Sequence, residues 1–296
     1  MNSASDQELF AWLTEENNPA VAYRTKTEIM GEKADASDVR VWLRSKLPEK
    51  WSETKGLWYV YYLTAFAECG LSVHDLEERE IAPALERLRT GTDGSCETLM
   101  LLRSLVKLGM TDGEVQSALR VLAKSDCSDG GYLCARRLNK LDYVPKSCYK
   151  ANLHALLLLA ECRKKGIDVL PEDKIVAYFL DRGIFYRKDD GKTLVLEDKP
   201  GWRTVDTFYP FEPMRVGLQN VIEAFCALGY GNDPRLAEAW DFLTAQTDET
   251  GKVLLCGTLS KTYLPKEKVG KPGKWVTFYS ELAKSERKDH DHDEGK

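Results

Sequence analysis

Three cysteines adjoin turns that precede apolar helical segments, where thiols could hold a metal ion. Cys96, Cys134 and Cys148 end the segments T-G-T-D-G-S-C, D-G-G-Y-L-C and K-S-C. A helix N-terminus favours the thiolate form of cysteine, and zinc binds thiolates in tetrahedral sites. The pattern predicts a zinc site, with Cys127, Asp129 or water as fourth ligand. Because short Cys-x-x-Cys pairs are absent, the alternative is that these cysteines pack as small apolar side chains.

A second group of reactive side chain types lies in and just after an insertion over residues 188–213. Acidic, basic and aromatic groups that converge on a concave surface are the usual composition of a ligand site. The alternative is a surface loop held by pairs of arginine and carboxylate. The candidate ligand-binding residues here are Trp202, Asp206, Tyr209, Glu212 and Arg215.

Two apolar segments carry further candidates. The segment L-W-Y-V-Y-Y contains Trp58 and Tyr62, whose rings at helical spacing either fill a core or line a cavity that stabilises cations. His154 interrupts the most apolar segment, Leu153–Leu159. This histidine is either a core residue with satisfied hydrogen bonds or a proton carrier that faces a cavity.

A repeated pair of helices must position these residues. In each unit an apolar helix ends at a glycine, an acidic linker and an amphipathic helix follow, and an acidic turn closes the unit about 20 residues later. The glycines are Gly70, Gly109, Gly166 and Gly229, and the turns begin at Asp93, Asp129, Asp189 and Asp248. The first helix of each pair is the more uniformly apolar, which predicts alternating inner and outer layers. We therefore expect an all-α fold in one domain over residues 1–284, with a disordered acidic and histidine-containing tail over 285–296.

This alternation resembles the α/α toroid of protein prenyltransferase β subunits and squalene or terpene cyclases. The segment A-W-D-F-L-T-A-Q-T-D-E-T-G-K is similar to the glutamine-tryptophan repeat of that superfamily. A group of bacterial and archaeal toroid proteins looks closer still, on the segments N-P-A-V-A-Y-R-T, D-G-G-Y-L-C, K-S-C-Y and K-P-G-K-W-V-T-F. The resemblance covers most of Pro19–Leu282. It implies a toroid of about five to six helical hairpins around a central cavity.

The resemblance implies a small, apolar, isoprenoid-like ligand in that cavity, without assigning a reaction. Class II cyclases share an Asp-x-Asp-Asp run, to which Asp189-Asp190 is the nearest approach in the body of this chain. Prenyltransferases share an Asp-x-Cys pair, whereas Asp126 and Cys127 are adjacent here. A carbohydrate-active α/α barrel and a non-enzymatic interaction scaffold are the alternative functions.

Composition excludes several other classes. The 296 residues are 43% hydrophobic and 30% charged with a net charge of −5, so we expect no nucleic-acid partner, which would require a clustered basic face. The longest apolar run, Leu153–Ala160, is too short to cross a bilayer, so no integral membrane segment is expected. The N-terminus lacks a secretory signal pattern, and with eight cysteines this favours a reducing cytoplasm. No P-loop, GxGxxG, GxSxG or HExxH motif occurs.

Overall fold

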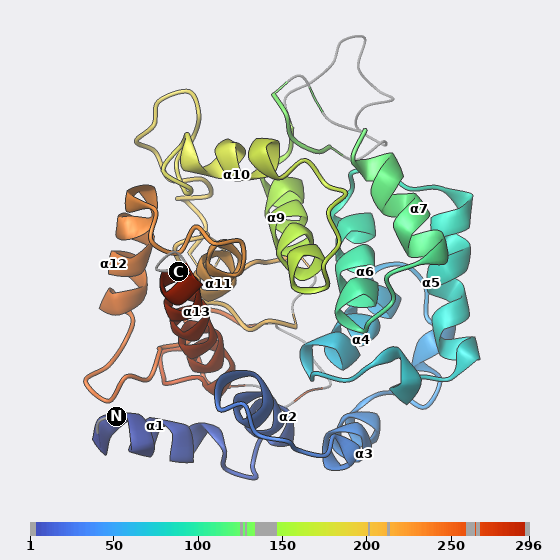
Figure 1. Cartoon of the computed structure of the whole chain (residues 1–296), viewed down its shortest axis with the longest axis horizontal. Helices are drawn as coiled ribbons and strands as arrows, with labels where there is room; N and C mark the ends of the chain where they lie inside the picture. The colour runs from blue at the N-terminus through green and yellow to red at the C-terminus, as the bar shows by residue number, and fades with distance from the viewer. Residues whose placement is uncertain are drawn as a thin grey trace. The chain divides into compact units, whose positions relative to one another are not determined.

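The computed structural model describes residues 4–124, 127, 129–133, 147–200, 202–211, 214–258, 264 and 267–293. Within these ranges the chain is all-α, as the sequence predicts, and its β pairings are isolated bridges. The chain divides into two compact units, Met1–Leu47 with Phe185–Lys296, and Pro48–Ile184. Figure 1 shows the helices of both units. The predicted domain over residues 1–284 spans parts of both.

The four glycines predicted to end helices all do so in the same way. They follow α4 (Leu57–Glu68), α6 (Cys96–Lys107), α9 (Tyr149–Lys164) and α11 (Leu218–Ala227). All four have positive φ, between 68° at Gly166 and 94° at Gly109, a conformation that glycine adopts without steric cost. The next residue then donates its N–H to a carbonyl of the last turn, as in Met110 to Leu105 at 2.9 Å. This is the Schellman ending, which satisfies a carbonyl that the helix leaves unpaired.

The unit Pro48–Ile184 contains two kinds of helix, which differ in burial. The apolar helices are α4, α6 and α9, and residues 151–162 of α9 are all buried. The amphipathic helices are α5 (Glu78–Thr90), α7 (Gly113–Leu122) and α10 (Glu172–Leu180). Of these, α7 buries one stripe, Val115, Ala118, Leu119 and Leu122. A helix with a single apolar stripe exposes its opposite face to water, as the sequence predicts for the second helix of each pair.

The apolar helix α6 packs against both α4 and α9, and side-chain contacts show that the three run in the same direction. Thr64 of α4 meets Ser104 of α6 with 3.0 Å between the hydroxyl oxygens. One turn further, Glu68 meets Lys107 with 3.2 Å between Oε2 and Nζ. Lys107 also reaches Glu161 near the end of α9, again at 3.2 Å. Contacts that advance together along two helices require parallel axes.

A buried cluster of ionised side chains joins these three helices. Glu68 is 1% exposed, and it accepts from Arg103 Nη2 at 2.5 Å as well as from Lys107. Glu161 is also buried and shares Lys107. Charges removed from water must be paired and hydrogen-bonded to be tolerated. The cluster therefore fixes the axial alignment of α4, α6 and α9.

The other unit packs the two ends of the chain together. Its helices are α1 (Ala4–Leu13), α2 (Pro19–Arg24), α3 (Ser37–Lys46), α11, α12 (Ala237–Ala245) and α13 (Lys274–Asp293), with a π-helical turn at Thr25–Ile29. α11 packs along α13. Arg24 is 2% exposed, donates to Tyr279 Oη at 2.9 Å and lies 4.5 Å above the ring of Phe278.

The last helix extends beyond the predicted boundary. The sequence predicts a disordered tail from Ser285, but α13 continues to Asp293. Arg287 supports this extension, because its guanidinium bonds to Asn232 and lies 5.1 Å from the ring of Trp240. The charged composition of this segment gave no indication of these contacts.

Removal of the central carboxylate of the ion cluster should cost far more stability than removal of an exposed one. We expect Glu68→Gln to lower the free energy of unfolding by about 3 kcal/mol, because Arg103 and Lys107, whose side chains are only 11% and 10% exposed, lose a buried charge partner. The matched control is Glu114→Gln, which breaks an exposed pair with Arg89 and should cost less than about 1 kcal/mol. Urea denaturation measures both. Equal losses would show that the cluster does not hold the three helices.

Candidate functional site

The turns that precede α6 and α9 place two predicted cysteines at neighbouring helix starts. Cys96 is the first residue of α6, and Ser95 caps the helix by accepting from the Thr98 N–H at 3.2 Å. Asp93 supports this cap by accepting from the Thr98 hydroxyl at 2.8 Å. Cys148 occupies the N-cap position of α9 without a side-chain cap bond, and its own N–H donates to the Tyr132 carbonyl at 2.8 Å.

The D-G-G-Y segment connects the two helix starts. Asp129 accepts from the Ser147 hydroxyl at 3.0 Å, and Asn152 accepts from the Tyr132 N–H at 3.1 Å. Gly131 has no room for a side chain, since a Cβ there would overlap with Ser147 and Asn152. The predicted turn chemistry therefore ties the D-G-G-Y segment to the start of α9.

The two thiols contact each other. A hydrogen bond with the Cys148 side chain is the main cause that raises the pKa of Cys96 well above its ordinary value. Burial of the thiol adds to this effect, and the positive charge of Lys150 opposes it. In a pair of contacting thiols, ionisation of one disfavours ionisation of the other.

Of the three cysteines predicted to bind zinc, the structure describes these two. Of the alternative fourth ligands, Cys127 is buried and Asp129 accepts from Ser147. Cys134 lies outside the described residues. Among the residues that are described, no group of three or more His, Cys, Asp or Glu side chains has an arrangement that could hold a metal ion. Structural zinc requires four ligands. The zinc site thus stays a prediction, and we derive no chemistry through it.

His154 lies one turn after Lys150 on α9 and is 2% exposed. Its two ring nitrogens, Nδ1 and Nε2, are buried and have no hydrogen-bond partner among the residues that the structure describes. Buried polar atoms in folded proteins nearly always have a partner, so such a ring is unusual. The described residues therefore do not support the alternative of a core histidine whose hydrogen bonds are satisfied by protein groups.

The surroundings of His154 keep its ring neutral. Burial is the main cause that lowers the pKa of His154 to about 3, and the positive charges of Arg103 and Lys150 lower it further. Arg103 belongs to the ion cluster through Glu68, so its position on α6 is fixed. A neutral imidazole presents one N–H donor and one nitrogen acceptor. The site thus combines two hydrogen-bonding atoms with two nearby cations.

The other predicted ligand residues of this unit form an aromatic group at the start of α4. Trp58 is 47% exposed, and its ring centroid lies 6.2 Å from that of Tyr62. Tyr62 is 2% exposed and packs against Trp51 at 6.3 Å. The prediction of a core role fits Tyr62, whereas Trp58 has a face open to solvent.

The insertion residues lie in the other unit, and the structure shows how they are held. Asp206 is buried and pairs with Arg203, whose Nη2 lies 2.7 Å from Oδ1. The guanidinium of Arg215 lies 3.7 Å from the ring centroid of Trp202. Tyr209 is 2% exposed and packs on Phe211 with 4.9 Å between centroids. Glu212 lies outside the described residues. These contacts agree with a loop held by arginine–carboxylate pairs, and a ligand-binding role stays a prediction.

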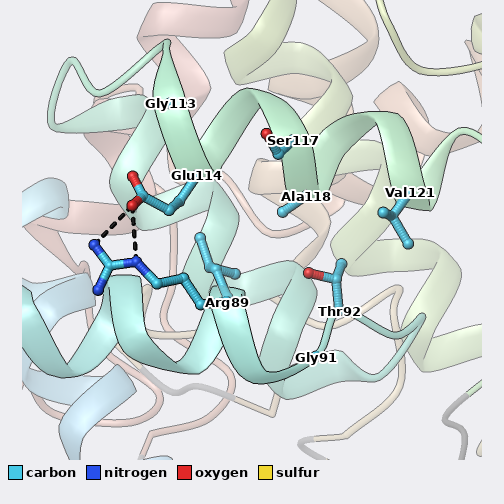
Figure 2. A pocket seen from close by; sticks show the side chains of 9 residues that line it. Arg89, Gly91, Thr92, Gly113, Glu114, Ser117, Ala118 and Val121 are labelled. Carbon is cyan, nitrogen blue, oxygen red and sulfur yellow. Dashed lines mark hydrogen bonds and ion pairs between the residues drawn. The ribbon is translucent and has the colours of Figure 1, made fainter.

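Sequence reasoning missed a groove between α5 and α7. It has a volume of about 590 Å³ and is lined by Leu88, Gly91, Thr92, Ser117 and Ala118 among others. Figure 2 shows that Arg89 and Glu114 join its two sides, with Arg89 Nη2 2.7 Å from Glu114 Oε1. No motif marks these positions, because they are scattered along two amphipathic helices and include both exposed residues such as Val121 and buried ones such as Leu88. The ion pair already satisfies the charged groups, so the groove offers little to a specific ligand.

Comparisons with known proteins do not assign this chain to a family. No family model matches the chain, and neither a curated protein nor a solved structure does. In the part of the chain that the structure describes, no helix has the length and apolar character needed to cross a membrane.

The neutral state of His154 predicts an acid-sensitive fold. Below pH 6.5 the unfolded chain binds a proton at this ring, whereas the folded chain does not until about pH 3. Stability should therefore fall as the pH drops from 6.5 toward 3, by about 1.4 kcal/mol per pH unit from this group.

Urea denaturation at pH 7 and pH 5 measures the effect. Wild type should lose about 2 kcal/mol more than His154→Leu over this interval. His74→Leu, at an exposed histidine of the same unit, is the control and should lose as much as wild type. If His154→Leu and wild type lose the same stability, His154 is not held neutral.

Proposed function

We propose that the chain is an α/α toroid that binds a small amphipathic molecule with an anionic head and an isoprenoid-like tail. The head would meet His154, Lys150 and Arg103 on α6 and α9. The single observation that carries this proposal is the buried ring of His154, whose two nitrogens have no partner among the described residues. A phosphate or carboxylate oxygen accepting from its N–H would supply one.

The electrostatics of the site favour an anionic group. Arg103 and Lys150 both act on His154 through their positive charges. Glu68 neutralises part of the charge of Arg103, and the buried Glu161 pairs with Lys107 one turn further along α6. Paired carboxylates of this kind are poorly suited to general acid and base work on a sugar, which needs each carboxyl group available. The cationic end of the site therefore favours an anionic ligand over a carbohydrate.

The tail would lie against apolar side chains of the same helices. On α9, Leu157 and Leu158 lie one turn beyond His154, and on α6 Met100 lies one turn before Arg103. All three are 4% exposed or less. An isoprenoid diphosphate combines an anionic head with an apolar tail. It therefore matches a site in which cations lie beside apolar helix surface.

The toroid itself is supported by the repeat. Four helices end in the same Schellman geometry, and three of them run parallel within one unit, as the inner helices of a toroid do. The location would be the cytoplasm, which suits the eight cysteines.

Isothermal titration of untagged protein tests the proposal with three probes: geranyl diphosphate, inorganic diphosphate and geraniol. We expect geranyl diphosphate to bind more tightly than either part alone. His154→Leu should weaken its binding about 10-fold to 100-fold, because a hydrogen bond to a charged group contributes about 1.5–3 kcal/mol.

His74→Leu is the matched control and should bind as wild type does. Equal affinity of His154→Leu and wild type for geranyl diphosphate would contradict the assigned site. Absence of binding by all three probes would contradict the proposed ligand class. Tight binding of geraniol with none of diphosphate would contradict the anionic head.

A further inference from the structure

We propose that Cys96 and Cys148 form a reversible dithiol–disulfide pair, which in its oxidised form links the start of α6 to the start of α9. The reaction takes a hydroperoxide as oxidant. This inference does not depend on the proposed ligand.

The positions of the two sulfur atoms are set by the backbone. Cys96 begins α6 and Cys148 caps α9, and these parallel helices pack together along their length. Their far ends are aligned by Lys107 and Glu161. A disulfide forms only where the two Cβ atoms already face each other at short range. The turns before the two helices meet at Tyr132: its carbonyl accepts the Cys148 N–H at 2.8 Å, and a Cβ at Gly94, two residues before Cys96, would lie 3.2 Å from its Cβ. The side chains of Cys96 and Cys148 interact across this contact.

Exposure distinguishes this pair from the other described cysteines. Cys69, Cys127, Cys162 and Cys226 are buried, which protects their thiols from oxidants in solution. Cys96 and Cys148 are partly exposed, as is Cys256. The Cys256 thiol donates to Gln246 Oε1 at 2.9 Å, so its contact is with an amide and not with a thiol. Cys256 is therefore an internal control for a partly exposed cysteine.

The local charges favour a single thiolate in the pair. Both sulfurs lie at N-termini of helices longer than ten residues, where the helix dipole stabilises negative charge, and Lys150 adds a positive charge near Cys96. Lys150 lies in the first turn of α9, two residues after Cys148, whereas the acidic Glu97 directly follows Cys96 in the first turn of α6. We therefore assign Cys148 as the attacking sulfur and Cys96 as the resolving one.

The reaction balances with one hydroperoxide. The Cys148 thiolate attacks a peroxide oxygen, the O–O bond breaks, and the leaving oxygen departs as hydroxide, which takes up a proton. This gives a sulfenic acid at Cys148. The Cys96 sulfur then attacks the sulfenic sulfur, the S–O bond breaks, and the hydroxyl leaves as water with the Cys96 proton. Two thiols are oxidised to one disulfide, and hydrogen peroxide is reduced to two waters.

Peroxide oxidation of the full chain tests the proposal. Reduced protein in EDTA is treated with one equivalent of hydrogen peroxide, and peptides are mapped without reduction. We expect one linked peptide that joins Cys96 to Cys148, and the thiol count in denaturant should fall by two from the eight of the reduced chain. Dithiothreitol should restore both thiols. The linked form should melt about 5 °C higher, because the bond closes a loop of more than 50 residues.

Single variants test the assigned roles. Cys96→Ser should stop at a sulfenic acid on Cys148 that dimedone traps, whereas Cys148→Ser should give no trapped sulfenic acid at Cys96. Cys256→Ser should form the Cys96–Cys148 link as wild type does. A disulfide from either cysteine to Cys127 or Cys134 would overturn the proposal. So would oxidation of Cys256 ahead of the pair, or eight unchanged thiols after treatment.

Discussion

The buried ion cluster of Glu68, Arg103, Lys107 and Glu161 is the constraint on which the unit Pro48–Ile184 depends. Apolar helices such as α4, α6 and α9 could slide past one another with little change in buried area, because leucine contacts are not directional. Charges removed from water allow no such freedom, since each must keep its partner within hydrogen-bond distance. The cluster therefore sets the axial positions of the three helices, and with them the side chains at the helix starts.

Two consequences follow from that alignment. Arg103, held by Glu68, lies close enough to His154 to act on its charge, and the start of α6 lies beside the start of α9 so that two thiols meet. A neutral imidazole, two cations and a pair of thiols thus lie on two adjacent parallel helices. The ion cluster stabilises the fold, and the same alignment brings these groups near one another.

The sequence predicted local features well, because they depend on local rules. The glycines that end helices, such as Gly109 with its φ of 94°, follow from backbone sterics. The D-G-G turn likewise follows from the size of its residues, since Gly131 has no room for a side chain. The pairing of Glu68 with Arg103, which are 35 residues apart, could not be predicted from the sequence. A charged residue on a helix is expected to face solvent unless its partner on another helix is known. For the same reason the sequence left two interpretations of His154, a core residue or a proton carrier. The continuation of α13 to Asp293 could not be predicted either, because it depends on contacts of Arg287 with Asn232 and Trp240.

Nitrogen-15 NMR of histidine-labelled protein tests the central claim most directly. The chain has four histidines, and a His154→Leu spectrum identifies the resonances of that ring. The account predicts that His154 keeps the shifts of a neutral imidazole from pH 7 down to about pH 4, and that these shifts change when geranyl diphosphate is added. Titration of His154 near pH 6.5, as in an exposed histidine, would contradict the account.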